Sequence, residues 1–199
     1  MIIVKKANNE EITLHPGEYH VSKRNVVIST LLGSCISACL YDPVNGVVGM
    51  NHFLLSNRKY ARNTPVCITE AGRYGVHAME LVINGMFKFG ANRNHLRAKV
   101  FGGGSFFQSG AEADNFICVG EVNKRFILEF LKNDGIPLVA SDLGGDRGRT
   151  ICFSSDDYSV MVKKTKKIAL SGLLKTERHF WLKSIEEHEK IEEEPDIWA

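Results

Sequence analysis

Two residues that could cooperate in nucleophilic chemistry, Cys35 and His52, stand in neighbouring apolar runs of the chain. Cys35 follows Gly33-Ser34 in "TLLGSC", and His52 lies within "MNHFLL". A thiol with an ordinary pKa of about 8.5 is a strong nucleophile only as the thiolate, and a neighbouring histidine is a common group to take its proton. The glycine lets the backbone approach closely just before the cysteine, where free N–H groups could bind an oxyanion. Both features suit acyl chemistry.

A predicted β-hairpin must bring the two side chains together. Residues 26–40 are almost free of charge, and "DPVNG" at 42–46 has strong turn chemistry. The segment 47–55, "VVGMNHFLL", is apolar again. The pattern predicts two antiparallel strands joined by this turn.

The register of this hairpin decides whether the pair can form. If Asp42 opposes Val47, then His52 opposes Ser37 and lies diagonally across from Cys35 on the same face of the sheet. A shift by two residues would place the cysteine and the histidine directly opposite each other. A slip by one residue would place them on opposite faces. The hairpin therefore permits the pair without proving it.

The remaining pattern predicts strands in runs with two helices between them. Such a pattern is typical of an α/β or α+β sandwich with a mixed sheet. Each helix should have one apolar face that packs on the core. In the first helix this face is made of Tyr74, Ala78, Leu81, Val82, Gly85 and Phe89. In the second it is made of Val122, Phe126, Ile127, Phe130 and Leu131. The expected segments are a helix over 69–90, strands at 97–101 and 115–119, a helix over 122–131 ending near 134–135, a strand at 136–140, a loop at 143–148, and a hairpin of 150–153 with 158–162.

Composition narrows the classes of protein. Lys and Arg number 25 against 23 for Asp and Glu, so no basic surplus indicates nucleic acid. The five cysteines are scattered without a CxxC pair, which excludes a disulfide framework or a zinc ribbon as the natural interpretation. The first four residues are apolar before two lysines, too short a run for a secretory signal or a membrane span. We therefore expect a cytoplasmic protein.

From spacing alone, two other interpretations stay open beside the catalytic pair. A cysteine and a histidine in apolar strands are often simply core residues. A zinc site built from Cys35, Cys39 and His52 is the weaker alternative, because no second pair of ligands follows.

Several motifs in order resemble the chemoreceptor glutamine deamidases, the CheD family of bacterial chemotaxis. The resemblance spans about residues 18–163. The motifs are "TLLGSCISACLYDP" at 30–43, "GMNHFLL" at 49–55, "AKVFGGG" at 98–104, "GEVN" at 120–123 and "DLGGDRGR" at 142–149. This ordered series is more specific than any one of its motifs.

The resemblance implies a fold and a set of site residues. It implies a three-layered α/β/α sandwich with a mixed β-sheet, similar to cysteine hydrolases. The family's nucleophile corresponds to Cys35 and its base to His52. The third residue of the family's triad corresponds to Thr30, although Ser29 also carries a hydroxyl at a plausible spacing. We expect a single deamidase domain over 1–167 and a charged C-terminal tail over 168–199, either helical or disordered.

The resemblance also implies an activity. This is hydrolysis of specific glutamine side chains on methyl-accepting chemotaxis receptors to glutamate, through a thioester, with release of ammonia. No cofactor and no metal is implied. The expected partners are the cytoplasmic domain of the receptors and the phosphatase CheC, with no nucleic acid and no membrane insertion. The alternatives are an adaptor that binds CheC or receptors with little catalysis, and a receptor methylesterase acting at the same site.

Overall fold

The computed structural model describes residues 1–5, 9–23, 25–55, 70–105, 119–165, 172, 175–180 and 182–183. Ten strands and two long helices make up the fold over these ranges. The strands are β1 (Ile2–Lys5), β2 (Glu10–Thr13), β3 (Tyr19–Ser22), β4 (Val26–Leu32), β5 (Ile36–Asp42), β6 (Val47–Asn51), β7 (Arg97–Gly102), β8 (Leu138–Leu143), β9 (Arg149–Ser154) and β10 (Val160–Lys164). The helices are α1 (Glu70–Lys88), the short 3-10 helix η2 (Arg93–His95) and α2 (Val119–Asn133).

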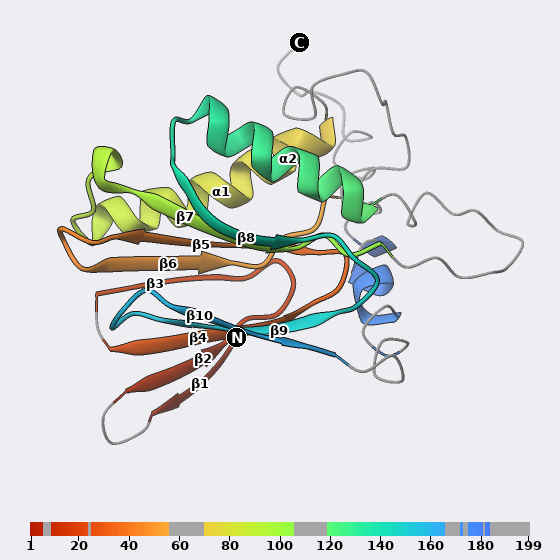
Figure 1. Cartoon of the computed structure of the whole chain (residues 1–199), viewed down its shortest axis with the longest axis horizontal. Coiled ribbons are helices and arrows are strands. Elements are labelled where there is room, and N and C mark those ends of the chain that lie inside the picture. The colour runs from red at the N-terminus through yellow and green to blue at the C-terminus, as the bar shows by residue number, and fades with distance from the viewer. Residues whose placement is uncertain are drawn as a thin grey trace, which may run out of the picture.

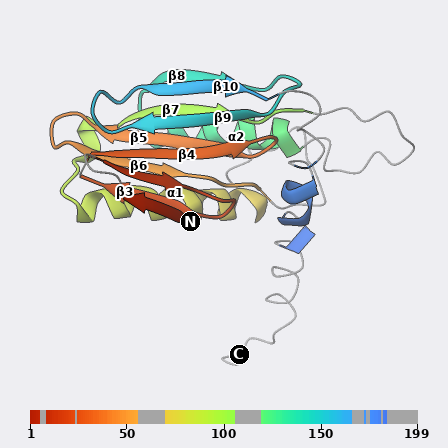
Figure 2. The same ribbon diagram turned by 90° about the horizontal axis from the view of Figure 1, so that it is seen from below.

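The strands form two five-stranded sheets that face each other. The first sheet has the order β1-β2-β4-β9-β10, and the second has the order β3-β6-β5-β7-β8. Each is mixed, because β2 pairs with β4 and β7 with β8 in parallel while the other pairs are antiparallel. Both α1 and α2 cover the outer face of the second sheet (Figures 1 and 2). No helix in the described part of the chain is long and apolar enough to cross a membrane.

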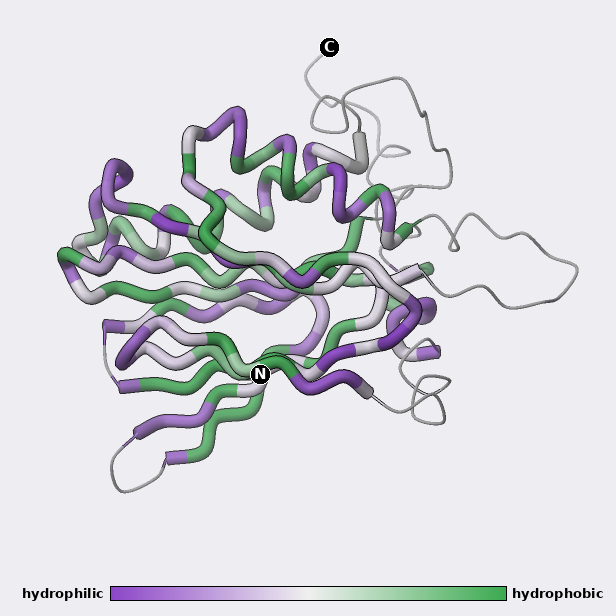
Figure 3. Tube along the Cα trace, viewed as in Figure 1, coloured by the Kyte–Doolittle hydropathy of each residue, from purple (hydrophilic) through white to green (hydrophobic). Residues whose placement is uncertain are grey.

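The expected α/β class and mixed pairing are confirmed, but the order of the layers differs from the expected α/β/α. The layers run helices, second sheet, first sheet (Figure 1). The first sheet takes the place of a second helical layer because its apolar side chains, among them Ile12, Ile28 and Phe153, are fully buried against the second sheet. Apolar stretches accordingly recur along the strands of both sheets (Figure 3).

Two apolar cores result from this layering. One lies between the helices and the second sheet and includes Val82, Met86, Val100 and Phe126. The other lies between the two sheets and contains Cys35, together with Met50 and Leu54 of the hairpin segment. The first sheet thus buries alternate side chains of β4 and β9, and the central strands β5 and β6 of the second sheet are buried on both faces.

The predicted helices are present, with one correction to the face of α1. Its buried residues include Gly75, Met79, Val82 and Met86, whereas Leu81 and Phe89 are 37% and 47% exposed. The rotation follows from close packing: a Cβ on Gly75 would lie 2.5 Å from the Phe126 ring of α2. The absence of a side chain at Gly75 lets the two helices approach.

The second half of the chain follows the prediction with smaller shifts. Helix α2 has the predicted apolar face and ends before Gly135, whose φ of 68° suits a helix stop. The strand predicted at 136–140 begins two residues later, at Leu138, and the closing hairpin is formed by β9 and β10. Most of the strand predicted at 115–119 lies outside the described residues, and Val119 begins α2.

The hairpin has the register that permits the pair. Asp42 opposes Val47 in the β5–β6 ladder, and the isolated bridge of Ile36 with Phe53 continues the same register. The apolar run 26–40 is nevertheless two strands rather than one. It breaks after Leu32, because β4 belongs to the first sheet and β5 to the second.

The Asp42 carboxylate fixes the turn of this hairpin, and we predict that Asp42→Asn destabilises the fold. Burial alone would raise its pKa, but hydrogen bonds from the Asn45 side chain and from the N–H groups of Asn92, Asn45 and Val44 lower the pKa to about 2. The side-chain amide of an asparagine would place its own NH2 group, a donor, against the N–H groups that donate to the carboxylate. We expect a loss of about 2 kcal/mol at neutral pH.

The pH dependence of unfolding tests this prediction. A carboxylate whose pKa is lowered by folding contributes stability that is present above its unfolded pKa of about 3.9 and is lost as the pH falls toward the folded value. Urea titrations of the wild type should therefore lose this contribution between about pH 4 and pH 2, and those of Asp42→Asn should lack it. Equal stability of the two proteins at pH 7 would contradict the prediction.

Candidate active site

The residues Gly33 to Cys35 form a crossover between the two sheets. They connect the end of β4 in the first sheet to the start of β5 in the second, which places the Cys35 side chain in the core between the sheets, fully buried. The carbonyl of Gly33 accepts from Gly104 N–H and that of Cys35 from Gly103 N–H, both at 2.8 Å. At Gly102, with φ of 114°, a Cβ would lie 2.0 Å from the Cys35 carbonyl oxygen. Hydrogen bonds from Gly103 and Gly104, together with the close approach at Gly102, thus hold the crossover in place.

Asn123 of α2 supports the crossover from the other side. Its amide nitrogen donates to the Ser34 carbonyl at 2.8 Å, and its amide oxygen accepts from Leu55 N–H at 2.9 Å. The side chain is completely buried. It therefore joins the crossover to the segment that follows His52. Sequence reasoning gave Asn123 no role of its own, although it belongs to the "GEVN" motif.

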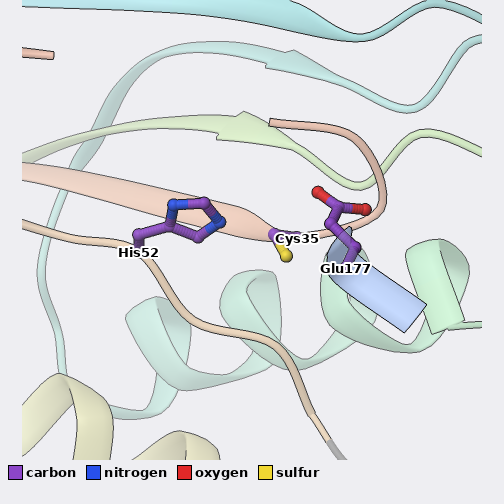
Figure 4. Close-up of side chains that lie close together, drawn as sticks. All are labelled: Cys35, His52 and Glu177. Atoms are coloured by element: carbon purple, nitrogen blue, oxygen red, sulfur yellow. The ribbon is translucent and has the colours of Figure 1, made fainter. Parts of the chain in front are cut away.

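His52 lies directly after β6, with its backbone held on both sides. Its N–H donates to the Glu18 carbonyl at 2.9 Å, and its carbonyl accepts from Gly17 N–H at 2.8 Å. The side chain is 2% exposed, and its ring edge points toward Cys35 (Figure 4). The Cys35 sulfur, a ring nitrogen of His52 and a carboxylate oxygen of Glu177 lie within 4.8 Å of one another.

Thr30 of β4 determines which ring nitrogen of His52 carries the hydrogen. Its Oγ1 donates to the Leu14 carbonyl at 2.8 Å and lies 2.7 Å from His52 Nδ1. Because the hydroxyl hydrogen is used on Leu14, Nδ1 must donate its own hydrogen to Oγ1. The other ring nitrogen, Nε2, then carries a free lone pair. It is buried without a hydrogen-bond partner among the described residues.

Ser29, the other hydroxyl residue considered from the sequence, takes a different direction. Its Oγ lies 3.3 Å from the Ile12 carbonyl and 3.2 Å from the Thr13 hydroxyl. Neighbouring residues on a strand point to opposite faces, so only one of the two hydroxyls can face the space between the sheets. That residue is Thr30.

Burial keeps the thiol and the imidazole neutral in this arrangement. It raises the pKa of Cys35 well above its usual range, and the nearby Glu177 carboxylate raises it further. Burial also lowers the pKa of His52 to about 3. A neutral imidazole with a free Nε2 lone pair is the form that can accept the thiol proton.

The structure adds Glu177, a residue that sequence reasoning missed, and does not assemble the alternative zinc set. Within the described ranges, Cys35 and His52 gather with Glu177 and without Cys39. Glu177 belongs to helical residues 175–180, inside the segment expected to be a charged tail, yet it is only 1% exposed. No feature of the sequence marks it among the many charges around it.

The α/β fold thus holds a thiol, an imidazole and a threonine hydroxyl close together at the crossover between its two sheets. These are residue types that nucleophilic catalysis uses. The comparisons with known proteins make this more specific. Residues 54–164, more than half of the chain, match the family model described as CheD chemotactic sensory transduction.

Two curated relatives match over most of their length. "Probable chemoreceptor glutamine deamidase CheD 1" of Geobacter sulfurreducens is 52% identical over 187 residues, covering 94% of this chain and 93% of the relative. "Probable chemoreceptor glutamine deamidase CheD 2" of Shewanella oneidensis is 46% identical over 152 residues, covering 75% and 74%. The chain belongs to the CheD family, as the sequence motifs predicted.

Among solved structures, the chain is similar to the Neisseria meningitidis protein NMB0706. The identity is 13% and the TM-score is 0.38, with 64% of this chain and 53% of the other covered.

Proposed function

We propose that this chain hydrolyses the side-chain amide of specific glutamines on chemoreceptors to glutamate and releases ammonia. Membership of the CheD family and the names of the relatives support this activity. The observation that best supports the proposed chemistry is the 2.7 Å hydrogen bond between Thr30 Oγ1 and His52 Nδ1. It leaves the Nε2 lone pair of His52 free on the side of Cys35. We assign Cys35 as nucleophile, His52 as general base and acid, and Thr30 as a positioning residue.

The proposed reaction has two halves. His52 Nε2 takes the thiol proton, the Cys35 sulfur attacks the amide carbon, and the C–N bond breaks as the imidazolium gives its proton to the leaving ammonia. His52 then takes a proton from water, whose oxygen attacks the thioester carbon; the C–S bond breaks to leave glutamate, and His52 returns the proton to the Cys35 sulfur. The N–H groups of Gly33 and Ser34 already bind carboxylate oxygens of Glu177 at 2.7 Å, and they are the donors for the oxyanion.

The proposal includes the setting of the reaction. The substrate is the cytoplasmic part of a methyl-accepting receptor, the enzyme acts in the cytoplasm, and the phosphatase CheC is a further partner. Each deamidation replaces a neutral side chain by an anion on the receptor. Neither a metal nor an organic cofactor takes part.

Incubation of the purified chain with cytoplasmic receptor fragments tests the function. We expect ammonia release together with conversion of glutamine to glutamate in peptide mass spectra. Methanol release from methylated fragments without ammonia would instead indicate a methylesterase. Receptor binding without release of ammonia or methanol would indicate an adaptor. Either of these two results would contradict the proposal.

The positioning role of Thr30 gives a separate prediction. Thr30→Val keeps the shape of the side chain but removes the oxygen that accepts from His52 Nδ1. We expect kcat for deamidation to fall by about 10- to 100-fold, as for one lost buried hydrogen bond. Thr30→Ser, which retains the hydroxyl, should recover most of this loss. A Thr30→Val variant as active as Thr30→Ser would exclude the role.

A further inference from the structure

The carboxylate of Glu177 occupies the space beside the proposed nucleophile. Its Oε1 accepts from Gly33 N–H at 2.7 Å, and its Oε2 accepts from both the N–H and the hydroxyl of Ser34 at 2.7 Å. The Cys35 sulfur lies between this carboxylate and the His52 ring (Figure 4). Two backbone donors and a hydroxyl next to a thiol are the groups that would hold the oxygen of an amide under attack.

The crossover has room for this ligand because residue 33 is a glycine. A Cβ on Gly33 would lie 2.6 Å from Glu177 Oε2 and 3.0 Å from its Cδ. Gly33 is not among the glycines with positive φ, so its backbone conformation is open to other residues. The absence of a side chain at Gly33 therefore lets the carboxylate come close. The donors of Gly33 and Ser34 fit the end of a glutamyl side chain.

The helix that carries Glu177 is anchored one turn further on. Phe180 is partly buried against the core between the sheets. At Gly17, an ideal Cβ would lie 3.1 Å from the Phe180 ring. Gly17 in turn donates its N–H to the carbonyl of His52. Glu177 and Phe180, on one face of a helical segment, thus contact both halves of the site: the crossover and the loop that holds the histidine.

A glutamyl carboxylate in this position has the chemical form of the reaction product. Hydrolysis of a glutamine side chain leaves this group, which has no amide left to cleave. Burial already raises the pKa of Cys35, and the negative charge of Glu177 beside the thiol raises it further. The carboxylate therefore opposes ionisation of the thiol. With the carboxylate in place, a receptor side chain cannot reach the same donors.

We propose that Glu177 is a tethered product analogue, which occupies the subsite for the glutamine side chain so that helical residues 175–180 compete with the receptor. This inference rests on the proposed function and adds two things to it. The subsite consists of Gly33 N–H together with the N–H and Oγ of Ser34. The receptor segment must displace the enzyme's own helix, and a glutamine presented from a helix can follow the path that Glu177 takes.

Self-deamidation of a Glu177→Gln variant tests the subsite. The Cys35 sulfur should bond to the Cδ of the introduced amide, ammonia should leave with a proton from His52, and water should hydrolyse the thioester to restore glutamate. We expect the mass of the peptide containing position 177 to rise accordingly, at a rate independent of protein concentration. The double variant with Cys35→Ala should keep the amide. Persistence of the amide in a single variant that still deamidates receptors would overturn the proposal.

Receptor kinetics of Glu177→Ala test the competition. If the helix is docked about nine-tenths of the time, its release should lower KM for the receptor fragment about tenfold, with little change in kcat. Lys175→Ala, a change at an exposed residue of the same helix, should leave KM as in the wild type. An unchanged KM in an active Glu177→Ala variant would overturn the proposal even if the receptor is deamidated.

Alkylation of Cys35 separates failure of this inference from failure of the proposed function. The reaction with iodoacetamide needs no receptor, and Glu177→Ala should speed it by about tenfold or more, since the thiol becomes accessible and its pKa falls. Variants that deamidate receptors but show no faster alkylation would refute the tethered analogue alone. Faster alkylation, with no ammonia released from receptors by any variant, would refute the proposed function and leave the helix as a cover of the thiol.

Discussion

Cys35→Ala will abolish conversion of receptor glutamine to glutamate. The change removes the only atom assigned to attack the amide, and loss of a nucleophile typically costs about 10⁶-fold in kcat. Fold stability should change far less, because alanine fills part of a small buried site whose backbone is held by the glycine triplet at 102–104. The measurement is ammonia release over hours, with thermal unfolding as the check on folding.

Cys39→Ala is the matched control for this variant. Cys39 is also fully buried, and burial raises its pKa to about 12, but it lies along β5 away from the His52–Glu177 group. We expect activity close to that of the wild type. Inactivation by Cys39→Ala together with full activity of Cys35→Ala would mean that the wrong thiol has been assigned.

His52→Gln will lower kcat by about 10²- to 10⁴-fold, the usual contribution of a general acid–base group. The glutamine side chain can still hydrogen-bond to Thr30, but it cannot take a proton from the thiol or return one to ammonia. His20→Gln, a change at a half-buried histidine of β3, is the control and should not reduce kcat. A His52→Gln variant within threefold of the wild type would contradict the assignment.

The protonation state of His52 offers a check that needs no substrate. Burial lowers its pKa to about 3, so the neutral imidazole persists far below the ordinary value of about 6.5. The ring signals of His52 in NMR spectra should therefore stay constant between about pH 5 and pH 8. A midpoint near the ordinary value would show that the ring is solvated and not held as described.

The hairpin and the proximity of Cys35 to His52 were predictable because they depend on local signals. The turn residues around Asp42 fix the register, and the register fixes the parity that puts Cys35 and His52 on one face. Thr30 could be proposed only through the family resemblance. Its separation from Ser29 required knowing which face of β4 meets the second sheet, a tertiary fact that alternation along one strand does not contain.

Other features depend on contacts between distant segments. The apolar run around Gly33 carries no signal that the chain changes sheets there, so it cannot indicate two stacked sheets. The α/β/α order is what the family resemblance implies. The need for glycine at position 75 of α1 comes from its contact with Phe126 of α2, a residue about fifty positions further along the chain. Glu177 lies more than a hundred residues from the crossover that it contacts, in a segment where a buried charge has no local signature.

The most direct test of the central claim, a thioester on Cys35, is the reaction of enzyme and receptor fragment in the presence of hydroxylamine. A thioester is captured by this nucleophile, so the modified receptor positions should carry a hydroxamate in proportion to the hydroxylamine added, and Cys35→Ala should yield neither hydroxamate nor glutamate. Glutamate as the sole product at every hydroxylamine concentration would mean that water attacks the amide directly, and it would contradict the account.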